Sequence, residues 1–209
     1  MIKMISAAAL ATILSLTSIP GLASEHGRYG YEMVSPAQPV ADPGKIEVVE
    51  LFWYGCPHCY RLEPTLNKWL KSKPADVEYV PIPAILTPQW ELLARAFYVS
   101  QTLGILDKTH QPLFDAIHGE RRRINSVKAL AEFYAEFGVD AETFNKTYRS
   151  FAVQTRVRQA KKMTQRYGIK GVPAIIVNGK YRTSGQLAGT NRQMIEVVNR
   201  LIEQERKNR

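Results

Sequence analysis

The first part of the chain alternates between strand-like and helix-like hydrophobic patterns. From Lys45 to Trp53 the side chains are mostly apolar, which is typical of a central strand covered on both faces. Helical spacing of apolar residues follows from Tyr60 to Leu70, and a second strand-like run extends from Val77 to Ile82. Because proline cannot donate a hydrogen bond to a neighbouring strand, Pro81 and Pro83 predict that this second strand is bulged or lies at a sheet edge.

The middle of the chain, from Gln89 to about Gln165, shows only helical spacing. Ser126 and Asp140 are suitable residues to begin two of its helices. A stretch this long without a clear strand predicts a helical subdomain inside an α/β chain, with its apolar stripes forming a core. The recurring apolar positions are Trp90, Leu93, Ala94, Phe97 and Tyr98; Leu113, Phe114 and Ile117; Val127, Leu130, Phe133, Tyr134 and Phe137; and Val153, Val157, Ala160, Met163 and Tyr167.

The last part of the chain returns to strand-like patterns. A short apolar run from Ala174 to Val177 leads into Asn178-Gly179, the strongest short signal for a β-hairpin, and Lys180 to Thr183 is predicted to return antiparallel. Ser184 to Gly189 is predicted to be a turn region. Thr190 is then expected to begin a closing helix with one apolar face.

Composition indicates a folded, exported protein. The 209 residues are 45% hydrophobic and 10% aromatic, which is enough for a core and excludes a disordered chain. The formal charge of +9 favours attraction of anions. Residues 1–23 read as a signal peptide, with Lys3, a short apolar run from Ile5 to Leu16, and small residues at Gly21 and Ala23. The alternative, an uncleaved membrane anchor, would need about 20 apolar residues.

The two cysteines of the chain lie together in Cys56-Pro57-His58-Cys59. This motif falls where the first strand turns into a helix, and Pro57 suits the first helical position. Cys56 is then at a helix N-terminus, where free backbone N–H groups favour an anion, and an anionic sulfur is the reactive thiolate. His58, when protonated, adds a second stabilising interaction.

Two other interpretations of the cysteine pair are less favoured. A structural disulfide closing so small a loop would constrain the unfolded chain little. A zinc site would need further ligands, and the chain offers neither a second cysteine pair nor a matching histidine pair. We therefore predict a redox-active pair and no metal. Cys56, at the exposed helix start, is predicted to form the mixed disulfide with substrate, and Cys59, shielded one turn inside, to close or open the internal bond.

With Gly171-Val172-Pro173 far downstream, this motif resembles the DsbA family of periplasmic thiol-disulfide oxidoreductases. The resemblance extends over nearly all of the chain after the leader. It implies an α/β thioredoxin-like fold with an inserted all-helical domain. The expected divisions are a signal peptide at 1–23, the first part of the thioredoxin-like domain at 24–88, the helical insertion at 89–165 and the second part at 166–209.

The family resemblance also assigns a second element of the site. Most X-Pro bonds are trans, and the residues alone do not decide whether the Val172-Pro173 bond is cis or trans. In thioredoxin-like proteins, however, the proline of this loop is cis and packs against the active-site pair. By resemblance, the backbone of Val172 would bind a substrate strand as an added β-edge, beside Pro173.

Glu50 stands out within the first strand because its parity with Ile46 and Val48 points it into the protein. A buried carboxylate is costly unless it is paired or protonated. Glu50 is therefore either a strand-end residue that reaches water or a buried acid that exchanges protons with Cys59. Glu63, one helical turn past Cys59, could share that role, and the family carries acids near the active site at both positions.

The predicted function is a periplasmic dithiol oxidase that donates its Cys56–Cys59 disulfide to newly exported proteins. No cofactor is expected beyond this disulfide, and no nucleic acid partner. By resemblance, a quinone-linked membrane oxidase of the DsbB type would reoxidise the protein, which we expect to be a monomer. The alternatives are a disulfide reductase or isomerase, and a non-catalytic periplasmic chaperone with a structural disulfide.

Two groups of charged or titratable residues are expected to lie on the surface. His110 and His118 lack partners at metal-binding spacing and are interpreted as surface or capping residues. The run Arg121-Arg122-Arg123 and the basic cluster between Arg156 and Arg166 could bind an anionic surface. Their helical placement favours solvated helix faces instead.

Overall fold

The structure is a computed structural model that describes residues 29–209. The predicted signal peptide, 1–23, lies outside the described residues. No helix among residues 29–209 is long and apolar enough to cross a bilayer.

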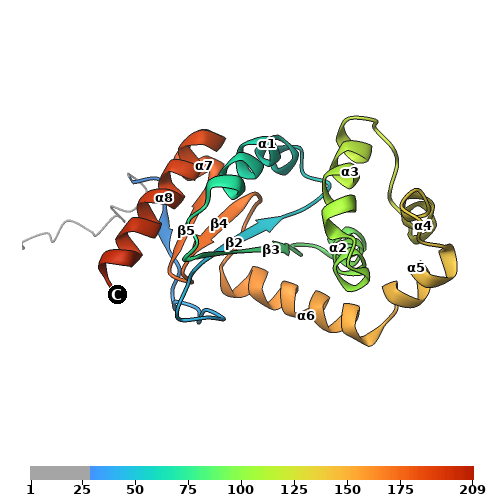
Figure 1. Ribbon diagram of the computed structural model, residues 1–209, viewed down its shortest axis with the longest axis horizontal. Helices are drawn as coiled ribbons and strands as arrows, with labels where there is room; N and C mark the ends of the chain where they lie inside the picture. The colour runs from blue at the N-terminus through green and yellow to red at the C-terminus, as the bar shows by residue number, and fades with distance from the viewer. Residues whose placement is uncertain (1–28) are drawn as a thin grey trace, which may run out of the picture.

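A five-stranded mixed sheet forms one half of the molecule, in the order β1-β5-β4-β2-β3 (Figure 1). The interior strand β2 runs parallel to the edge strand β3 and antiparallel to β4, and every residue of β2 is buried. The edge position of β3 confirms the prediction from its prolines. The strands are β1 (Glu32–Met33), β2 (Ile46–Phe52), β3 (Val77–Pro83), β4 (Ala174–Val177) and β5 (Tyr181–Ser184).

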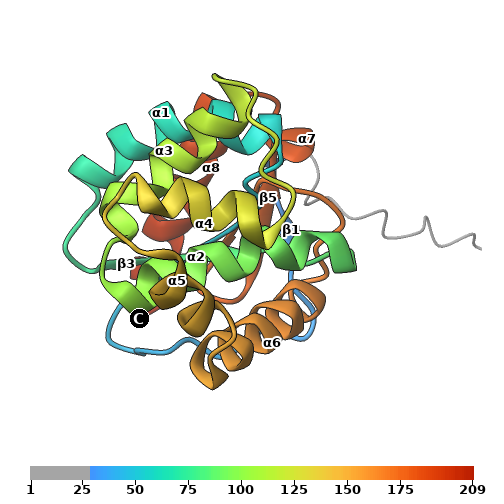
Figure 2. The ribbon, with the colours of Figure 1, turned by 90° about the vertical axis from the view of Figure 1, so that its right-hand side faces the viewer.

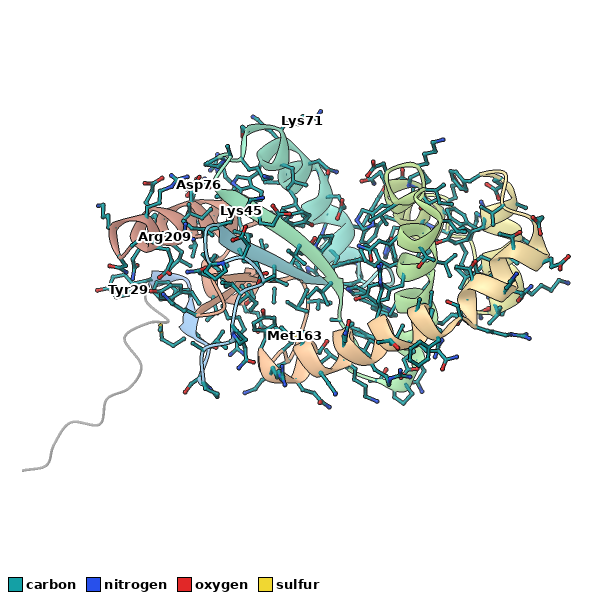
Figure 3. The ribbon with its side chains drawn as sticks, turned by 60° about the horizontal axis from the view of Figure 1, so that its bottom comes forward. Tyr29, Lys45, Lys71, Asp76, Met163 and Arg209 are labelled. Atoms are coloured by element: carbon teal, nitrogen blue, oxygen red, sulfur yellow. The ribbon has the colours of Figure 1, made fainter. Side chains whose placement is uncertain are left out.

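Helices cover both faces of this sheet, which explains why β2 is apolar at consecutive positions. On one face α1 (Pro57–Ser72) and α8 (Asn191–Lys207) pack on alternate residues of β2 and β4, including Val48 and Ile175. On the other face Val49 meets the end of α6 (Phe151–Arg166), where Met163 lies beside the sheet (Figure 3). The exposed basic side chains of α6 confirm the expected solvated face. The helical placement expected for Arg121-Arg122-Arg123 is wrong, because these residues lie in a loop.

The other half of the molecule is helical (Figure 2). Its core includes the buried rings of Phe97, Phe114 and Tyr134, and it continues without a break to Phe52 at the end of β2. Because the two halves share this core, they meet beside the motif that follows β2. The helices are η2 (Pro88–Trp90), α2 (Glu91–Leu103), α3 (Leu106–His118), α4 (Val127–Ala135), α5 (Ala141–Tyr148) and α6. The exact domain boundaries at 88 and 165 stay a prediction.

The helix starts expected from the sequence are confirmed. The side chains of Ser126, Asp140 and Thr190 each accept a hydrogen bond from a backbone N–H in the first turn of α4, α5 and α8. One local expectation is wrong: the region from Ser184 to Gly189, predicted as a turn, contains the short helix α7 (Gly185–Ala188). Its single turn is too short to produce a helical repeat of apolar residues.

The hairpin between β4 and β5 has the predicted turn. Asn178 and Gly179 both have positive φ angles, 51° and 66°, as the turn predicted from this dipeptide requires. Lys180 is the third residue between the paired Val177 and Tyr181, and its N–H donates to the Val177 carbonyl oxygen. A Cβ atom on Gly179 would lie 2.0 Å from the backbone oxygen of Gln38, so Gly179 is required for close approach as well as for its φ. Gly138 also has a positive φ, 80°, but no atom lies within 4 Å of the position its Cβ would take.

Replacing these two glycines by alanine should lower the free energy of unfolding by different amounts. Gly138→Ala should cost about 1–2 kcal/mol, the usual penalty of a left-handed L-residue. Gly179→Ala should cost clearly more, because the backbone at Gln38 must also move. Urea denaturation of both variants measures the difference; equal losses would show that the Gln38 contact is unimportant.

Candidate active site

Cys56 and Cys59 lie at the junction between β2 and α1. Cys56 is the N-cap residue of α1 and Pro57 is its first residue, as predicted. Both thiols are free, so the structure describes the dithiol form. Cys59 is completely buried, whereas Cys56 is 8% exposed. Cys56 is thus the more accessible sulfur, but it is far less exposed than we expected from its place at a helix start.

The surroundings of Cys56 favour its thiolate. The pKa of Cys56 is lowered to about 6, first because the Cys59 thiol donates a hydrogen bond to its sulfur. Burial opposes this effect. The backbone N–H groups of Cys59 and His58 add to the lowering, and the charge of His58 contributes least. The helix N-terminus therefore acts as predicted, but the strongest stabilising contact comes from the second cysteine.

Cys59 has the opposite environment. Its pKa is raised well above the ordinary value, mainly because burial disfavours a charged sulfur, and the Cys56 sulfur and Glu50 raise it further. The two sulfurs, three positions apart, are thus strongly inequivalent. One is poised to be an anion, and the other is poised to hold a proton.

The two residues between the cysteines are exposed. Pro57 holds the first turn of α1, and His58 lies beside Arg61, whose guanidinium donates to His58 Nδ1 at 2.9 Å. His58 also lines a cavity of about 530 Å³ together with the loop from Gly168 to Ala174. The motif therefore forms part of the wall of a surface cavity large enough for several side chains of a bound peptide.

The proline loop lies directly beside Cys56. The Val172-Pro173 peptide bond is cis, as the family resemblance implied. The sulfur of Cys56 is 3.4 Å from the carbonyl oxygen of Val172, a contact that joins residues 116 positions apart. Loop and motif thus form one surface next to the cavity.

Glu50 and Glu63 are both buried, with 0% and 2% of their surfaces exposed. This excludes the interpretation of Glu50 as a strand-end residue that reaches water. The pKa of Glu50 is raised to about 8, first by burial and then by the nearby charge of Glu63, although the hydroxyl of Tyr79 donates a hydrogen bond to Glu50. Glu50 therefore holds a proton at neutral pH beneath the cysteine pair.

The expectation that His110 and His118 are surface or capping residues is wrong. Both lie on the inner face of α3 and bind Tyr54: His110 Nδ1 is 2.7 Å from the Tyr54 hydroxyl, and His118 Nε2 is 2.7 Å from the Tyr54 carbonyl oxygen. His110 Nε2 is also 3.8 Å from Glu63 Oε1. The spacing of His110, Phe114 and His118 could have revealed this, because residues four apart share one helix face.

The described part of the chain offers no set of ligands for a metal ion. No group of three histidine, cysteine, aspartate or glutamate side chains there could hold a metal ion. The groups that the site brings together are two inequivalent sulfurs with buried acids near them.

Comparison with known proteins agrees with this geometry. The family of DSBA-like thioredoxin domains matches residues 47–196. The chain belongs to the DsbA family. The thiol:disulfide interchange protein DsbA of Pseudomonas aeruginosa is 40% identical over 201 residues, which cover 94% of this chain and 95% of that protein. DsbA of Azotobacter vinelandii is 45% identical over 168 residues, covering 80% and 78%.

Solved DsbA structures have the same fold. The crystal structure of Pseudomonas aeruginosa DsbA superposes with a TM-score of 0.81 at 42% identity, covering 86% of this chain and 93% of that one. DsbA from Xylella fastidiosa gives 0.79 at 30% identity, covering 85% and 96%. The predicted α/β thioredoxin-like fold with a helical insertion is confirmed, and so is the predicted enzyme class of thiol:disulfide oxidoreductase.

The asymmetry between Cys56 and Cys59 predicts a pH dependence. The pKa of Cys56 falls from an ordinary 9.0 to about 6 on folding. The thiolate's contribution to the stability of the reduced protein is therefore complete above about pH 9, and it is lost as the pH falls through about 6. Thiolate absorbance of the reduced protein should titrate near pH 6 and be absent in Cys56→Ser. A midpoint near 9 would contradict the structure.

Glu50 predicts a pH dependence of opposite sign. Its pKa is 4.5 when unperturbed and about 8 in the folded protein, so folding is increasingly penalised as the pH rises between these values. The free energy of unfolding of Glu50→Gln, relative to the unmodified protein, should therefore increase between about pH 5 and about pH 8. Urea denaturation tests this, with exposed Glu196→Gln on α8 as a control that should show no such trend.

Proposed function

We propose that the chain is a periplasmic oxidase that donates a Cys56–Cys59 disulfide to cysteine pairs of newly exported proteins. The observation that supports this most directly is the contrast between Cys56, whose pKa is about 6, and the deeply buried Cys59. A stabilised Cys56 thiolate favours the reduced enzyme, which makes the disulfide form an oxidant.

The reaction proceeds by two thiol–disulfide exchanges. A substrate thiolate attacks Cys56, the more accessible sulfur; the Cys56–Cys59 bond breaks, and Cys59 leaves as a thiolate. A second substrate thiolate then attacks the mixed disulfide, and Cys56 leaves. The substrate loses two electrons to the enzyme's sulfurs and gains a disulfide. Cys59 takes up a proton, while Cys56 remains largely ionised at neutral pH.

Val172 and Pro173 form the proposed substrate-binding surface. Their loop borders both the Cys56 sulfur and the cavity of about 530 Å³, so an extended substrate segment placed along Val172 would present its cysteine to Cys56. His58 lines the same cavity and adds charge beside the Cys56 sulfur, whereas Pro57 fixes the first turn of α1.

Glu50 and Glu63 are proposed to supply the proton for Cys59. Glu50 is protonated at neutral pH and lies close enough to Cys59 to affect its pKa. When Cys59 leaves as a thiolate, transfer from Glu50 neutralises it inside the protein. Glu63 lies one turn beyond Cys59 on α1, and its charge helps to raise the pKa of Glu50.

The remaining parts of the proposal concern partners. A membrane oxidase of the DsbB type would restore the disulfide after each cycle, and the protein would act as a monomer without a bound cofactor. The main alternative activities are reduction and isomerisation. The low pKa of Cys56 favours oxidation over these, because it makes the reduced form of the enzyme the more stable one.

Equilibration with glutathione buffers tests the direction of the reaction. The Cys56–Cys59 pair, scored by thiol alkylation, should stay reduced until the buffer is strongly oxidising. A pair that stays oxidised in reducing buffer would indicate a reductase or a structural disulfide.

Single cysteine variants test the order of attack. Cys56→Ser should abolish oxidation of a peptide with two cysteines. With the peptide supplied in its disulfide form, Cys59→Ser should instead accumulate a mixed disulfide between Cys56 and the peptide, visible by mass spectrometry. The Cys56 thiolate attacks the peptide disulfide, one peptide sulfur leaves as a thiolate, and the Cys59 thiol that would displace the peptide is gone. A mixed disulfide on Cys59 in Cys56→Ser at a similar rate would reverse the assigned roles.

A further inference from the structure

The proton that Cys59 needs has no direct route from water. Cys59 and Glu50 have no exposed surface, and only 2% of Glu63 is exposed. One oxygen of each carboxyl group, Glu50 Oε1 and Glu63 Oε1, is buried and has no hydrogen-bond partner among the described residues. Buried polar atoms normally have a hydrogen-bond partner. These two carboxyl oxygens lack one, so packing alone does not explain why the two acids are buried here.

His110 is a titratable side chain that lies between this buried pair and the surface. Its Nε2 atom is 3.8 Å from the unpartnered Glu63 Oε1, and its side chain is 21% exposed. Its Nδ1 atom is 2.7 Å from the hydroxyl of Tyr54. The aromatic rings of Phe52 on β2, Phe97 on α2 and Phe114 on α3 surround the imidazole, so the titratable groups that face it are Tyr54 and Glu63.

The contacts of Tyr54 favour one tautomer of His110. Burial keeps the pKa of Tyr54 well above its usual range, so its hydroxyl carries a proton that it can donate to His110 Nδ1. The neutral ring then carries its own proton on Nε2, which faces Glu63. To pass a proton inward, this ring first takes up a second proton from solvent and becomes an imidazolium; the cation then gives its Nε2 proton to Glu63 and returns to the neutral form.

We propose that Glu63 and Glu50 exchange protons with solvent through His110, which is thus a positioning residue for the redox reaction. This inference rests on the proposed oxidase function. When Cys59 leaves as a thiolate, Glu50 gives it a proton and becomes a carboxylate. Glu63 and His110 pass a replacement proton inward from water, so that one proton enters for each thiol formed and the charges balance. No other reactant is required.

Replacement of His110 provides the test. In His110→Ala, the rate at which the oxidised protein reacts with a two-cysteine peptide at neutral pH should fall about 10-fold, less than the roughly 100-fold or more typical of a group that transfers protons directly to reactants. Acid quenching followed by thiol alkylation gives the rate. Added imidazole should restore much of it, because the vacated site is partly open to solvent.

Two controls separate proton transfer from packing. Pyrazole has the shape of imidazole but is a far weaker base, and it should not restore the rate. His118→Ala is the matched variant, since His118 lies on the same helix face and also binds Tyr54, at the Tyr54 carbonyl oxygen. Within residues 29–209, His118 makes no ion pair with a carboxyl group. Its reaction should not respond to imidazole.

The possible results lead to distinct conclusions. A normal rate in His110→Ala, equal restoration by pyrazole, or no restoration by imidazole would overturn the role of His110. Failure of the unmodified protein to oxidise the peptide would instead overturn the proposed oxidase function, so the two proposals fail in different measurements.

Discussion

The site depends on a single junction, at which the fully buried interior strand β2 ends at the start of a helix. Because β2 is buried on both faces, the position of its last residue, Phe52, is fixed. The first turn of α1 then begins at Cys56 with little conformational freedom. That placement directs the backbone N–H groups of the first turn at the Cys56 sulfur. The same burial places Glu50 beneath the pair, where a carboxyl group keeps its proton.

This junction produces opposite environments for two chemically identical groups. Cys56 receives hydrogen bonds at the helix end, whereas Cys59, one turn further, lies wholly inside the protein. Stabilisation of one thiolate depends in part on the other cysteine keeping its proton, because the Cys59 thiol donates to Cys56. The buried acids are thus connected to reactivity at Cys56 through Cys59, since whatever holds the proton on Cys59 also favours the neighbouring anion.

Local sequence signals predicted most of the fold and the centre of the site. The apolar run of β2, the Asn178-Gly179 turn and the caps at Ser126 and Asp140 are determined by neighbouring residues, so short patterns reveal them. The accessibility of Cys56 and the positions of His110 and His118 depend on contacts across 56 to 116 positions of the chain. A spacing rule can place a histidine on a helix face, but it cannot show which loop that face will meet.

The helical half of the molecule therefore contributes to the site as well as to the core. Its helix α3 holds Tyr54, two positions before Cys56, at both the hydroxyl and the carbonyl oxygen. Phe52 joins the same aromatic cluster from the end of β2, so the strand end and the loop that follows it are both bound to the insertion. A change in the packing of α3 would thus alter the position of the cysteine motif and the surroundings of Glu63 together, because His110 contacts both Tyr54 and that buried acid.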